Sequence, residues 1–387
     1  MDSNSNTEGQ NDLTKEVKLF TPGPLGTSPS VKQAMLRDLG SRDTEMISVI
    51  REIRNKLVDI AGVSRDKFTC VPVQGSGTFA VEAVLNTTTH KDNARVLVLV
   101  NGSYGERMEI MCQHMGLEVH AMRLPDNEPI SANKVKQFLQ KDNKWSNIAI
   151  VHLETTHGLL NPLEEVGRVV REECPDAIFI ADCMSSFGSV SFDVEEAKAD
   201  FLVSSANKCL QGVPGFAYTI CRRDKLMQCK GQSTSLALDL VAQYEGLERN
   251  GQFRFTPPTH CLLAFRQALK EFEAEGGVIG RGKRYKENYT ILDEGMRKLG
   301  FKAYIPENDR GCVITSFFSP KHKNFTFEEF YNKLHNYDQV IYPGKTAKFD
   351  CFRIGNIGHL FPGDIQHLLD CISKVLNEMG VPTPVSC

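Results

Sequence analysis

The sequence predicts an α/β protein with a large domain built on a mainly parallel sheet, followed by a smaller α+β domain. From Lys67 onward, short β-branched runs alternate with amphipathic stretches of about ten residues, the pattern of βαβ units around a sheet that is buried on both faces. After about residue 236 the pattern changes to long, charged helical stretches. The length of 387 residues is also about two to three times that of a usual domain.

Six or seven short apolar runs are the expected strands of the large sheet. They lie at 67–73, 95–100, 117–122, 147–153, 177–183, 201–204 and 216–222. The segments between them carry apolar residues at helical spacing, notably at 78–86 and 162–173. The second of these opens with Pro162 and Glu164, which are both favoured in the first turn of a helix.

The C-terminal part is predicted to form a separate unit. Long helices are expected at 260–275 and 280–299, the second ending at Gly300 as a C-cap does. Strands are expected near 301–305, 312–318, 339–342 and 349–354, and helices near 326–335 and 363–379. We therefore expect a disordered N-terminal tail over 1–17, a large domain over 18–276 and a small domain over 277–387.

The composition argues against several functional classes. The 45 basic and 48 acidic residues give a formal charge of −3, too balanced for a protein whose main partner is nucleic acid or an anionic membrane. No apolar run approaches the roughly 18 residues that cross a bilayer, and residues 1–17 resemble neither a secretory signal nor a mitochondrial presequence. The 12 cysteines include no C-x-x-C pair, which favours reduced thiols over disulfides or zinc. We expect a folded, cytoplasmic protein without a metal site.

The first chemical signal is VQGSGTFAVEAV at 73–84, where a strand ends and a helix begins. The N–H groups of Ser76, Gly77 and Thr78 would lie at the helix N-terminus, where hydrogen bonds and the helix dipole favour a phosphate.

The same segment satisfies the G-x-G-x-x-A pattern of dinucleotide-binding enzymes. The next strand, however, ends in Asn101 and Gly102 instead of the acidic residue that binds a ribose. A dehydrogenase and a purely structural turn therefore remain as alternatives to a phosphate site.

The second signal is the pair Asp182 and Lys208, each following an apolar strand. Because open α/β sheets bind ligands at the carboxyl ends of their strands, these side chains and the phosphate turn should converge on one crevice. Taken singly, Asp182 also fits a turn residue and Lys208 a surface cation. Together, an amine, a carboxylate and a phosphate cradle are what pyridoxal phosphate requires.

Eight motifs occur along the chain in the order that is typical of one enzyme family. They closely resemble the 2-aminoethylphosphonate–pyruvate transaminases, in the alanine-glyoxylate/serine-pyruvate branch of fold-type I pyridoxal phosphate aminotransferases. The resemblance covers the chain after Lys18, and it implies a mainly parallel seven-stranded sheet and a homodimer whose active sites use both subunits. The motifs are TPGPLGTS (21–28), QGSGTFAVEAV (74–84), NGSYGER (101–107), LETTHGLLNP (153–162), ADCMSSFG (181–188), SSANKCLQGVPGF (204–216), FTPPTH (255–260) and FRIGNIG (352–358).

The resemblance implies the catalytic roles. Lys208 would hold the cofactor as a Schiff base and then act as base and acid, while Asp182 would pair with the ring nitrogen. Arg353 would bind the anionic end of both substrates, because a guanidinium grips a carboxylate or a phosphonate with two donors. An interdomain ion pair is the structural alternative for Arg353.

The resemblance also implies the residues that hold the cofactor. Tyr104 would stack on the ring and Thr156 would meet its phenolic oxygen, although Tyr104 also fits a packing role. For Thr256 the alternative is a helix cap. The implied phosphate ligands are Ser76, Gly77, Thr78, Asn207 and, from the other subunit, Thr256.

The activity that the resemblance implies is transfer of the amino group of 2-aminoethylphosphonate to pyruvate by a ping-pong mechanism. The alternative on the same scaffold is an alanine-glyoxylate or serine-pyruvate transaminase. A catalytically silent protein would be expected to have lost Lys208, Asp182 or Arg353. One departure stands out: His157 occupies a position where the family usually carries Thr, so a titratable group is expected near the phenolic side of the ring.

Overall fold

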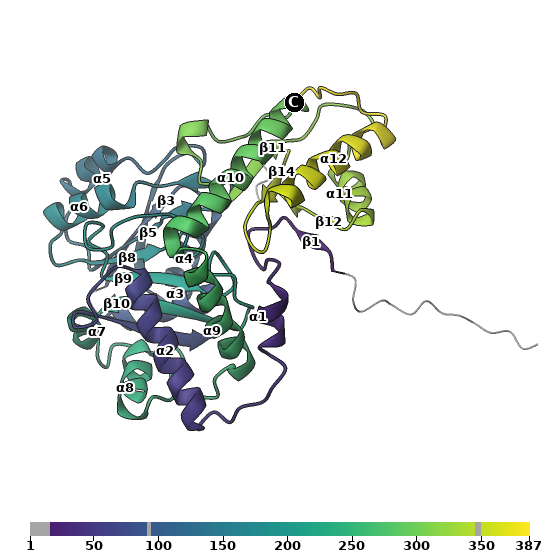
Figure 1. Ribbon diagram of the computed structural model, residues 1–387. Helices are drawn as coiled ribbons and strands as arrows, with labels where there is room; N and C mark the ends of the chain where they lie inside the picture. Colours follow the sequence, from purple (N-terminus) through teal and green to yellow (C-terminus); the bar gives the residue numbers. More distant parts are fainter. Residues whose placement is uncertain (1–15, 91–93, 345–349) are drawn as a thin grey trace, which may run out of the picture.

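The computed structural model describes residues 16–90, 94–344 and 350–387 and shows a large and a small domain (Figure 1). The predicted tail over 1–17 lies outside the described residues except for Glu16 and Val17. The large domain holds a seven-stranded sheet in the order β2-β10-β9-β8-β5-β3-β4. Its strands are β2 (Phe68–Gln74), β3 (Arg95–Val100), β4 (Glu118–Arg123), β5 (Asn147–Val151), β8 (Ile178–Asp182), β9 (Phe201–Ser205) and β10 (Phe216–Arg222).

The sheet is parallel except for β10, which runs antiparallel to both of its neighbours. The prediction of a mainly parallel sheet is confirmed, and each expected strand lies within two residues of an observed one. Every residue of β5 and β9 is buried, as expected for strands covered on both faces. The carboxyl ends of β2, β8 and β9 meet at one edge, which positions the site described below.

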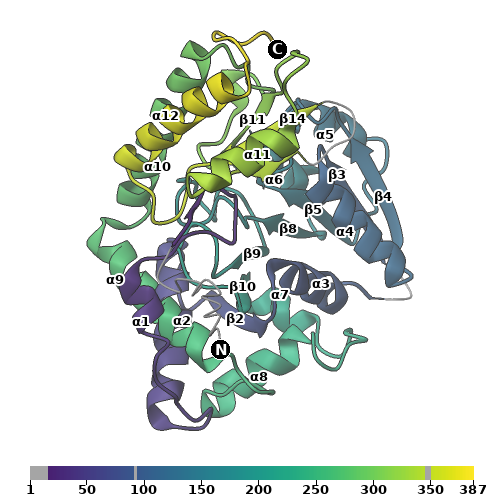
Figure 2. The ribbon, with the colours of Figure 1, turned by 90° about the vertical axis from the view of Figure 1, so that its right-hand side faces the viewer.

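Helices cover both faces of this sheet. Figure 2 shows α2 (Thr44–Ile60) and α9 (Thr259–Ala274) on one side and α3 (Gly77–Thr88) and α4 (Ser103–His114) on the other. In α2 the buried Met46, Val49, Ile53 and Leu57 recur every three or four residues, which gives the helix one apolar face. The remaining helices of this domain are α1 (Pro29–Gln33), α5 (Ala132–Leu139), α6 (Leu163–Glu173), α7 (Arg223–Gln228) and α8 (Leu240–Asn250), and a short hairpin joins β6 (Leu153–Glu154) to β7 (Leu159–Leu160).

The small domain packs helices on a three-stranded sheet in the order β11-β14-β13. The strand expected at 301–305 is not present, because only Ala303 bridges to a neighbour, Phe317. The expected strand 339–342 is split between two sheets. The elements are α10 (Gly277–Lys298), a 3-10 turn (Glu307–Asp309), β11 (Ile314–Phe318), α11 (Phe327–Asn336), β12 (Gln339–Val340), β13 (Tyr342–Pro343), β14 (Cys351–Gly355) and α12 (Pro362–Glu378).

The described chain begins in contact with the small domain. Strand β1 (Lys18–Leu19) pairs in parallel with β12, and the next residue, Phe20, is buried in the core that contains Phe352 and Leu368. The division that we predict at residue 276 stays a prediction, but by their contacts residues 18–20 lie with the small domain.

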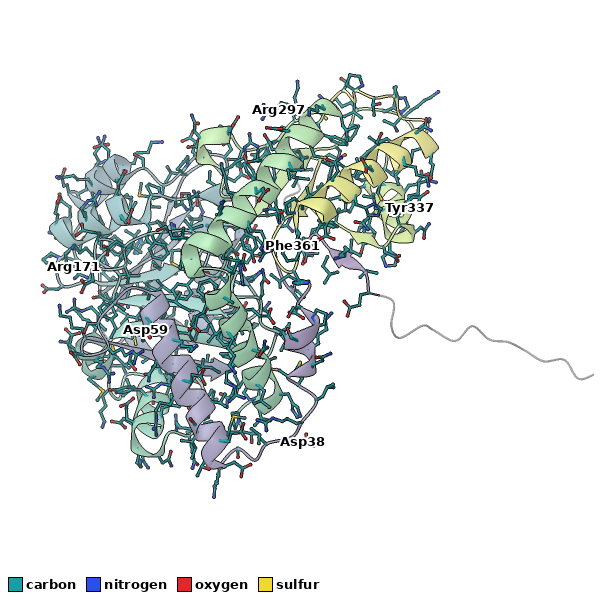
Figure 3. The ribbon with its side chains drawn as sticks, viewed as in Figure 1. Asp38, Asp59, Arg171, Arg297, Tyr337 and Phe361 are labelled. Atoms are coloured by element: carbon teal, nitrogen blue, oxygen red, sulfur yellow. The ribbon has the colours of Figure 1, made fainter. Side chains whose placement is uncertain are left out.

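Polar contacts join the two domains near the point where α9 ends and α10 begins. The Arg284 side chain pairs with Glu275 at 2.7 Å and donates hydrogen bonds to the carbonyls of Gly358 and Leu360. Its guanidinium carbon also lies 4.9 Å from the ring centroid of Phe361, which Figure 3 shows at the base of the small domain.

Candidate active site

Lys208 follows strand β9 and points its amine at the N-terminal segment. Its Nζ donates a hydrogen bond to the carbonyl oxygen of Pro22 at 2.8 Å. Gly23 permits this approach: a Cβ there would lie 2.8 Å from both Cδ and Nζ of Lys208, and the φ of +119° disfavours any other residue.

The surroundings of Lys208 make its amine a better nucleophile. The pKa of Lys208 is lowered to about 8: burial is the main cause, the positive charges of Arg353 and Arg107 contribute to the lowering, and the negative charge of Asp182 opposes it. About one lysine in ten at this position is therefore neutral at pH 7, far more than for an exposed lysine.

Asp182 is the last residue of β8, and its carboxylate lies at the same sheet edge. Its Oδ1 accepts a hydrogen bond from the N–H of Met184 at 2.8 Å. The pKa of Asp182 is raised to about 6: burial is the main cause and the charge of Glu154 contributes, whereas the hydrogen bond from Met184 and the charges of Lys208 and Arg107 oppose the rise. The group is still mostly ionised at pH 7, so it can pair with a cationic ring nitrogen.

The predicted phosphate turn joins β2 to α3. Gly75 has a φ of +107°, and Ser76 is the N-cap of α3 but does not cap it with its side chain. The first N–H groups of a helix have no partner within it, so this end is suited to bind an anion. A Cβ on Gly77 would fall 2.4 Å from the sulfur of Met184, so the turn packs against the residue that donates its N–H to Asp182.

These groups surround one cavity of about 560 Å³. Of the predicted site residues, Ser76, Gly77, Thr78, Tyr104, Asp182, Asn207 and Lys208 line it. Thr156, Arg353 and Thr256 are not among the described residues that form its lining.

Thr156 instead contacts the first residue of α4, Ser103. Its hydroxyl accepts a hydrogen bond from the N–H of Ser103 at 2.9 Å and donates one to Glu154 at 2.5 Å. The threonine thus helps to hold the helix that carries Tyr104, an arrangement that sequence reasoning did not predict.

Arg353 is buried at the junction of the domains. Its Nε donates to the carbonyl of Pro343 and its Nη1 to that of Thr155, both at 2.9 Å. No carboxylate of the described residues lies within ion-pair distance, so the alternative of an interdomain ion pair is not what these residues show. Burial lowers the pKa of Arg353, with Tyr104 and Glu154 among the nearby groups that oppose the shift.

Thr256 is exposed, and its chain segment is anchored beside the phosphate turn. The Nε2 of Gln74 donates hydrogen bonds to the carbonyls of Phe255 and Thr256, at 3.1 and 3.0 Å. The Thr256 side chain does not cap α9, which begins at Thr259 after the N-cap Pro258.

His157 does not line the cavity. Its Nε2 lies 3.4 Å from Oδ2 of Asp126, its Nδ1 lies 3.4 Å from Oγ of Ser316, and its ring is 4.4 Å from that of Tyr304. The histidine therefore joins the two domains behind the loop whose Thr155 carbonyl binds Arg353.

Arg107 is a cavity residue that sequence reasoning missed. It lines the cavity from α4, one turn after Tyr104. The motif NGSYGER contains both residues, and a helix predicted over 103–114 would have placed them on the same face.

The arrangement fits pyridoxal 5′-phosphate by its chemistry. The start of α3 offers N–H donors for a phosphate, the buried Asp182 offers a negative charge for a ring nitrogen, and Lys208 offers an amine with a lowered pKa. Among the described residues, no cluster of His, Cys, Asp and Glu side chains is suited to hold a metal ion. No described helix combines the length and the apolar character that a membrane span needs.

Comparison with known proteins decides the family. The family model for class-V aminotransferases matches residues 29–337. The chain belongs to the class-V aminotransferases.

Relatives of this class-V aminotransferase are considerably closer in sequence than its structural neighbours. A 2-aminoethylphosphonate–pyruvate transaminase from Syntrophobacter fumaroxidans is 44% identical over 94% of this chain and 97% of its own length. A bifunctional phosphonoacetaldehyde hydrolase/aminoethylphosphonate transaminase from Clostridioides difficile is also 44% identical, over 93% of this chain, which spans only 56% of that protein. The solved pyridoxamine-pyruvate aminotransferase from Mesorhizobium loti superposes with a TM-score of 0.87 at 21% identity, covering 96% and 95% of the two chains, and thus confirms the fold.

Proposed function

We propose that this chain is a pyridoxal 5′-phosphate-dependent transaminase that moves the amino group of 2-aminoethylphosphonate to pyruvate, giving phosphonoacetaldehyde and L-alanine. The observation that carries the chemistry is the convergence of Lys208, Asp182 and the 76–78 turn on one cavity. The relatives named above support the substrates. The bifunctional relative supports the product as well, because the other activity in its name, phosphonoacetaldehyde hydrolase, consumes phosphonoacetaldehyde.

Asp182 would pair with the ring nitrogen of the cofactor. When bound, the cofactor supplies a ring that accepts the electrons left by a broken C–H bond. The buried carboxylate of Asp182 would keep a proton on the ring nitrogen, since the pairing of opposite charges favours both ionised forms. Ser76, Gly77, Thr78 and Asn207 would hold the phosphate, and Tyr104 would stack on the ring.

Lys208 would perform the proton transfers. In its neutral form Nζ would hold the cofactor covalently, and once the substrate amine had taken its place, the same nitrogen would be free to accept the proton from the amine-bearing carbon of the substrate and to give it back later in the reaction. The carbonyl of Pro22, 2.8 Å from Nζ, orients the amine within the cavity.

Arg353 would bind the anionic end of each substrate in turn. Two of its nitrogens are held by main-chain carbonyls, and this fixes the plane of the guanidinium beside the cavity. A phosphonate and a carboxylate both match the donors of a guanidinium, so one cation serves both half-reactions.

We also propose a homodimer in which Thr256 of the partner subunit approaches the cofactor phosphate. Apolar side chains are exposed on the segments that flank the cavity, including Phe79, Ile110 and Phe255. These side chains are exposed in a single subunit and would be buried against a second copy in the dimer. Sedimentation of the purified protein, with Thr256→Ala tested for weaker cofactor binding, would check both parts.

A cytoplasmic location completes the proposal. All 12 cysteines are free, which fits a reducing compartment. Cell fractionation with a cytoplasmic marker tests it.

The deciding experiment measures alanine formed by the purified protein with pyridoxal phosphate and pyruvate. The donors 2-aminoethylphosphonate, serine and glycine are compared separately, and alanine with glyoxylate is measured in parallel. A strong preference for the phosphonate is expected. A preference for serine, or for alanine with glyoxylate, would favour the alternative transaminase on the same scaffold.

A further inference from the structure

We propose that Arg107 is a cofactor-binding residue whose guanidinium binds the 5′-phosphate of pyridoxal phosphate alongside the 76–78 turn. The inference rests on the proposed function, because it requires that cofactor.

The position of Arg107 suits this role. Its Nη1 donates a hydrogen bond to Oγ1 of Thr78 at 3.3 Å, so the guanidinium already touches the phosphate turn. Its central carbon lies 4.9 Å from the ring centroid of Tyr104, and the aromatic face therefore fixes the plane of the guanidinium. Both partners line the cavity, as Arg107 itself does.

The charge of Arg107 lacks a counterion. Within the described part of the chain, no carboxylate lies within ion-pair distance of its guanidinium, and its one hydrogen bond to another side chain goes to a neutral hydroxyl. Arginines on the two strands that α4 packs against behave differently: Arg95 of β3 pairs with Glu118 and Asp142, and Arg123 of β4 pairs with Glu109. A half-buried guanidinium of this kind is best stabilised by a doubly charged anion, to which it can donate two charge-assisted hydrogen bonds.

Arg107 also lies close enough to Asp182 to lower the pKa of that carboxyl. In pyridoxal phosphate, the ring carbon that carries the phosphate arm is separated from the ring nitrogen by a single carbon atom. A cation that contacts Thr78 and acts on Asp182 therefore lies along this edge of the ring. Arg353 donates to the carbonyl of Thr155 and is not among the described residues that line the cavity, whereas Arg107 lines it, so we assign the two arginines to different anions.

The test compares two ligands that differ only by the phosphate. Apoprotein is titrated with pyridoxal 5′-phosphate and, separately, with pyridoxal, and binding is followed by absorbance. For Arg107→Gln we expect the Kd of pyridoxal phosphate to rise about 10- to 100-fold, as loss of a charge-assisted contact implies, while the Kd of pyridoxal changes less than about twofold. Arg107→Lys, which keeps the charge but not the fork, should recover part of the affinity.

The matched control is Arg123→Gln, because Arg123 also contacts α4, through Glu109, but lies outside the cavity lining. Both affinities should stay at the wild-type value in this variant. If Arg107→Gln weakened the binding of pyridoxal and of pyridoxal phosphate equally, the proposal would be overturned in favour of a structural role. An unchanged Kd for pyridoxal phosphate together with a raised KM for 2-aminoethylphosphonate would assign Arg107 to the substrate instead.

Failure of this inference is distinguishable from failure of the proposed function. The ratio of the two affinities needs no turnover, so it can show the phosphate contact even if the wild-type protein uses a different amino donor. Conversely, a wild-type protein that transaminates 2-aminoethylphosphonate while Arg107→Gln binds pyridoxal phosphate normally would overturn the inference alone.

Discussion

The Oε2 atom of Glu154 accepts a hydrogen bond from the backbone N–H of Tyr104 at 3.1 Å. It also accepts one from Gly105, while Oε1 accepts from both the N–H and the hydroxyl of Thr156. The carboxylate is buried, and it lies at the N-terminus of α4, where the helix dipole favours a negative charge. Glu154 therefore fixes the turn from which Tyr104 and Arg107 reach the cavity.

Glu154→Gln should destabilise the protein, because an amide cannot accept at both of its ends and leaves buried N–H groups unpaired. We expect the free energy of unfolding to fall by about 2–4 kcal/mol in urea denaturation. Glu106→Gln, on the exposed side of the same helix, is the control and should cost less than about 1 kcal/mol. Equal effects of the two changes would contradict the role given to Glu154.

Capture of the cofactor should depend on pH through Lys208. Because only the neutral amine attacks the cofactor aldehyde and the pKa of Lys208 is lowered to about 8, the rate of capture by apoprotein should rise through about pH 8 and then level off. Stopped-flow absorbance between about pH 6 and pH 10 measures it. Lys208→Ala should show no absorption band of lysine-bound cofactor at any pH, and a band that persists would refute the assignment.

Arg353→Lys should damage both half-reactions. The lysine keeps the positive charge but loses the two-pronged contact, so we expect KM to rise about tenfold or more for 2-aminoethylphosphonate and for pyruvate alike. Steady-state kinetics with each substrate varied in turn provide the measurement. An increase for pyruvate alone would show that the substrates do not share this anion site.

His157→Thr should leave the pH dependence of turnover unchanged. The histidine contacts Asp126, Ser316 and Tyr304 and does not line the cavity, so it does not touch the groups that react. We expect a loss of about 1 kcal/mol in the free energy of unfolding from the broken contacts. A displaced midpoint in the profile of kcat against pH would instead place His157 in contact with the reaction.

Gly23→Ala should impair cofactor binding. The added methyl group would meet Nζ and Cδ of Lys208 at 2.8 Å, and the φ of +119° adds backbone strain. We expect capture of pyridoxal phosphate to slow at least about tenfold. Gly26→Ala is the control, because a Cβ there meets nothing within 4 Å; matching rates in the two variants would show that the close approach is unimportant.

Features that depend on contiguous residues could be predicted from the sequence. Asp182 ends one apolar run and Lys208 follows another, so the strand pattern alone predicts that both lie at one edge of the sheet with the phosphate turn at 76–78. Their convergence on a single cavity then follows from the parallel arrangement of the strands.

Features that depend on distant contacts could not be predicted. Strand β1 has two residues and pairs with β12 more than 300 positions away, so no local pattern announces it. The hydroxyl of Thr156 matches a cofactor ligand by its motif, but the buried carboxylate of Glu154 engages it. Arg107 was overlooked because the motif NGSYGER shows neither its contact with Thr78 nor that it forms no ion pair with the described residues.

The N-terminal segment connects both domains at the reacting amine. The main chain of Phe20 is hydrogen-bonded to Val340 and Gly355 of the small domain, and two residues later the carbonyl of Pro22 receives the amine of Lys208. A rigid-body rotation of the small domain would pull this short segment with it and shift the acceptor of the lysine proton. The position of the small domain and the position of the hydrogen-bond acceptor of Lys208 are thus coupled through the main chain of residues 20–22.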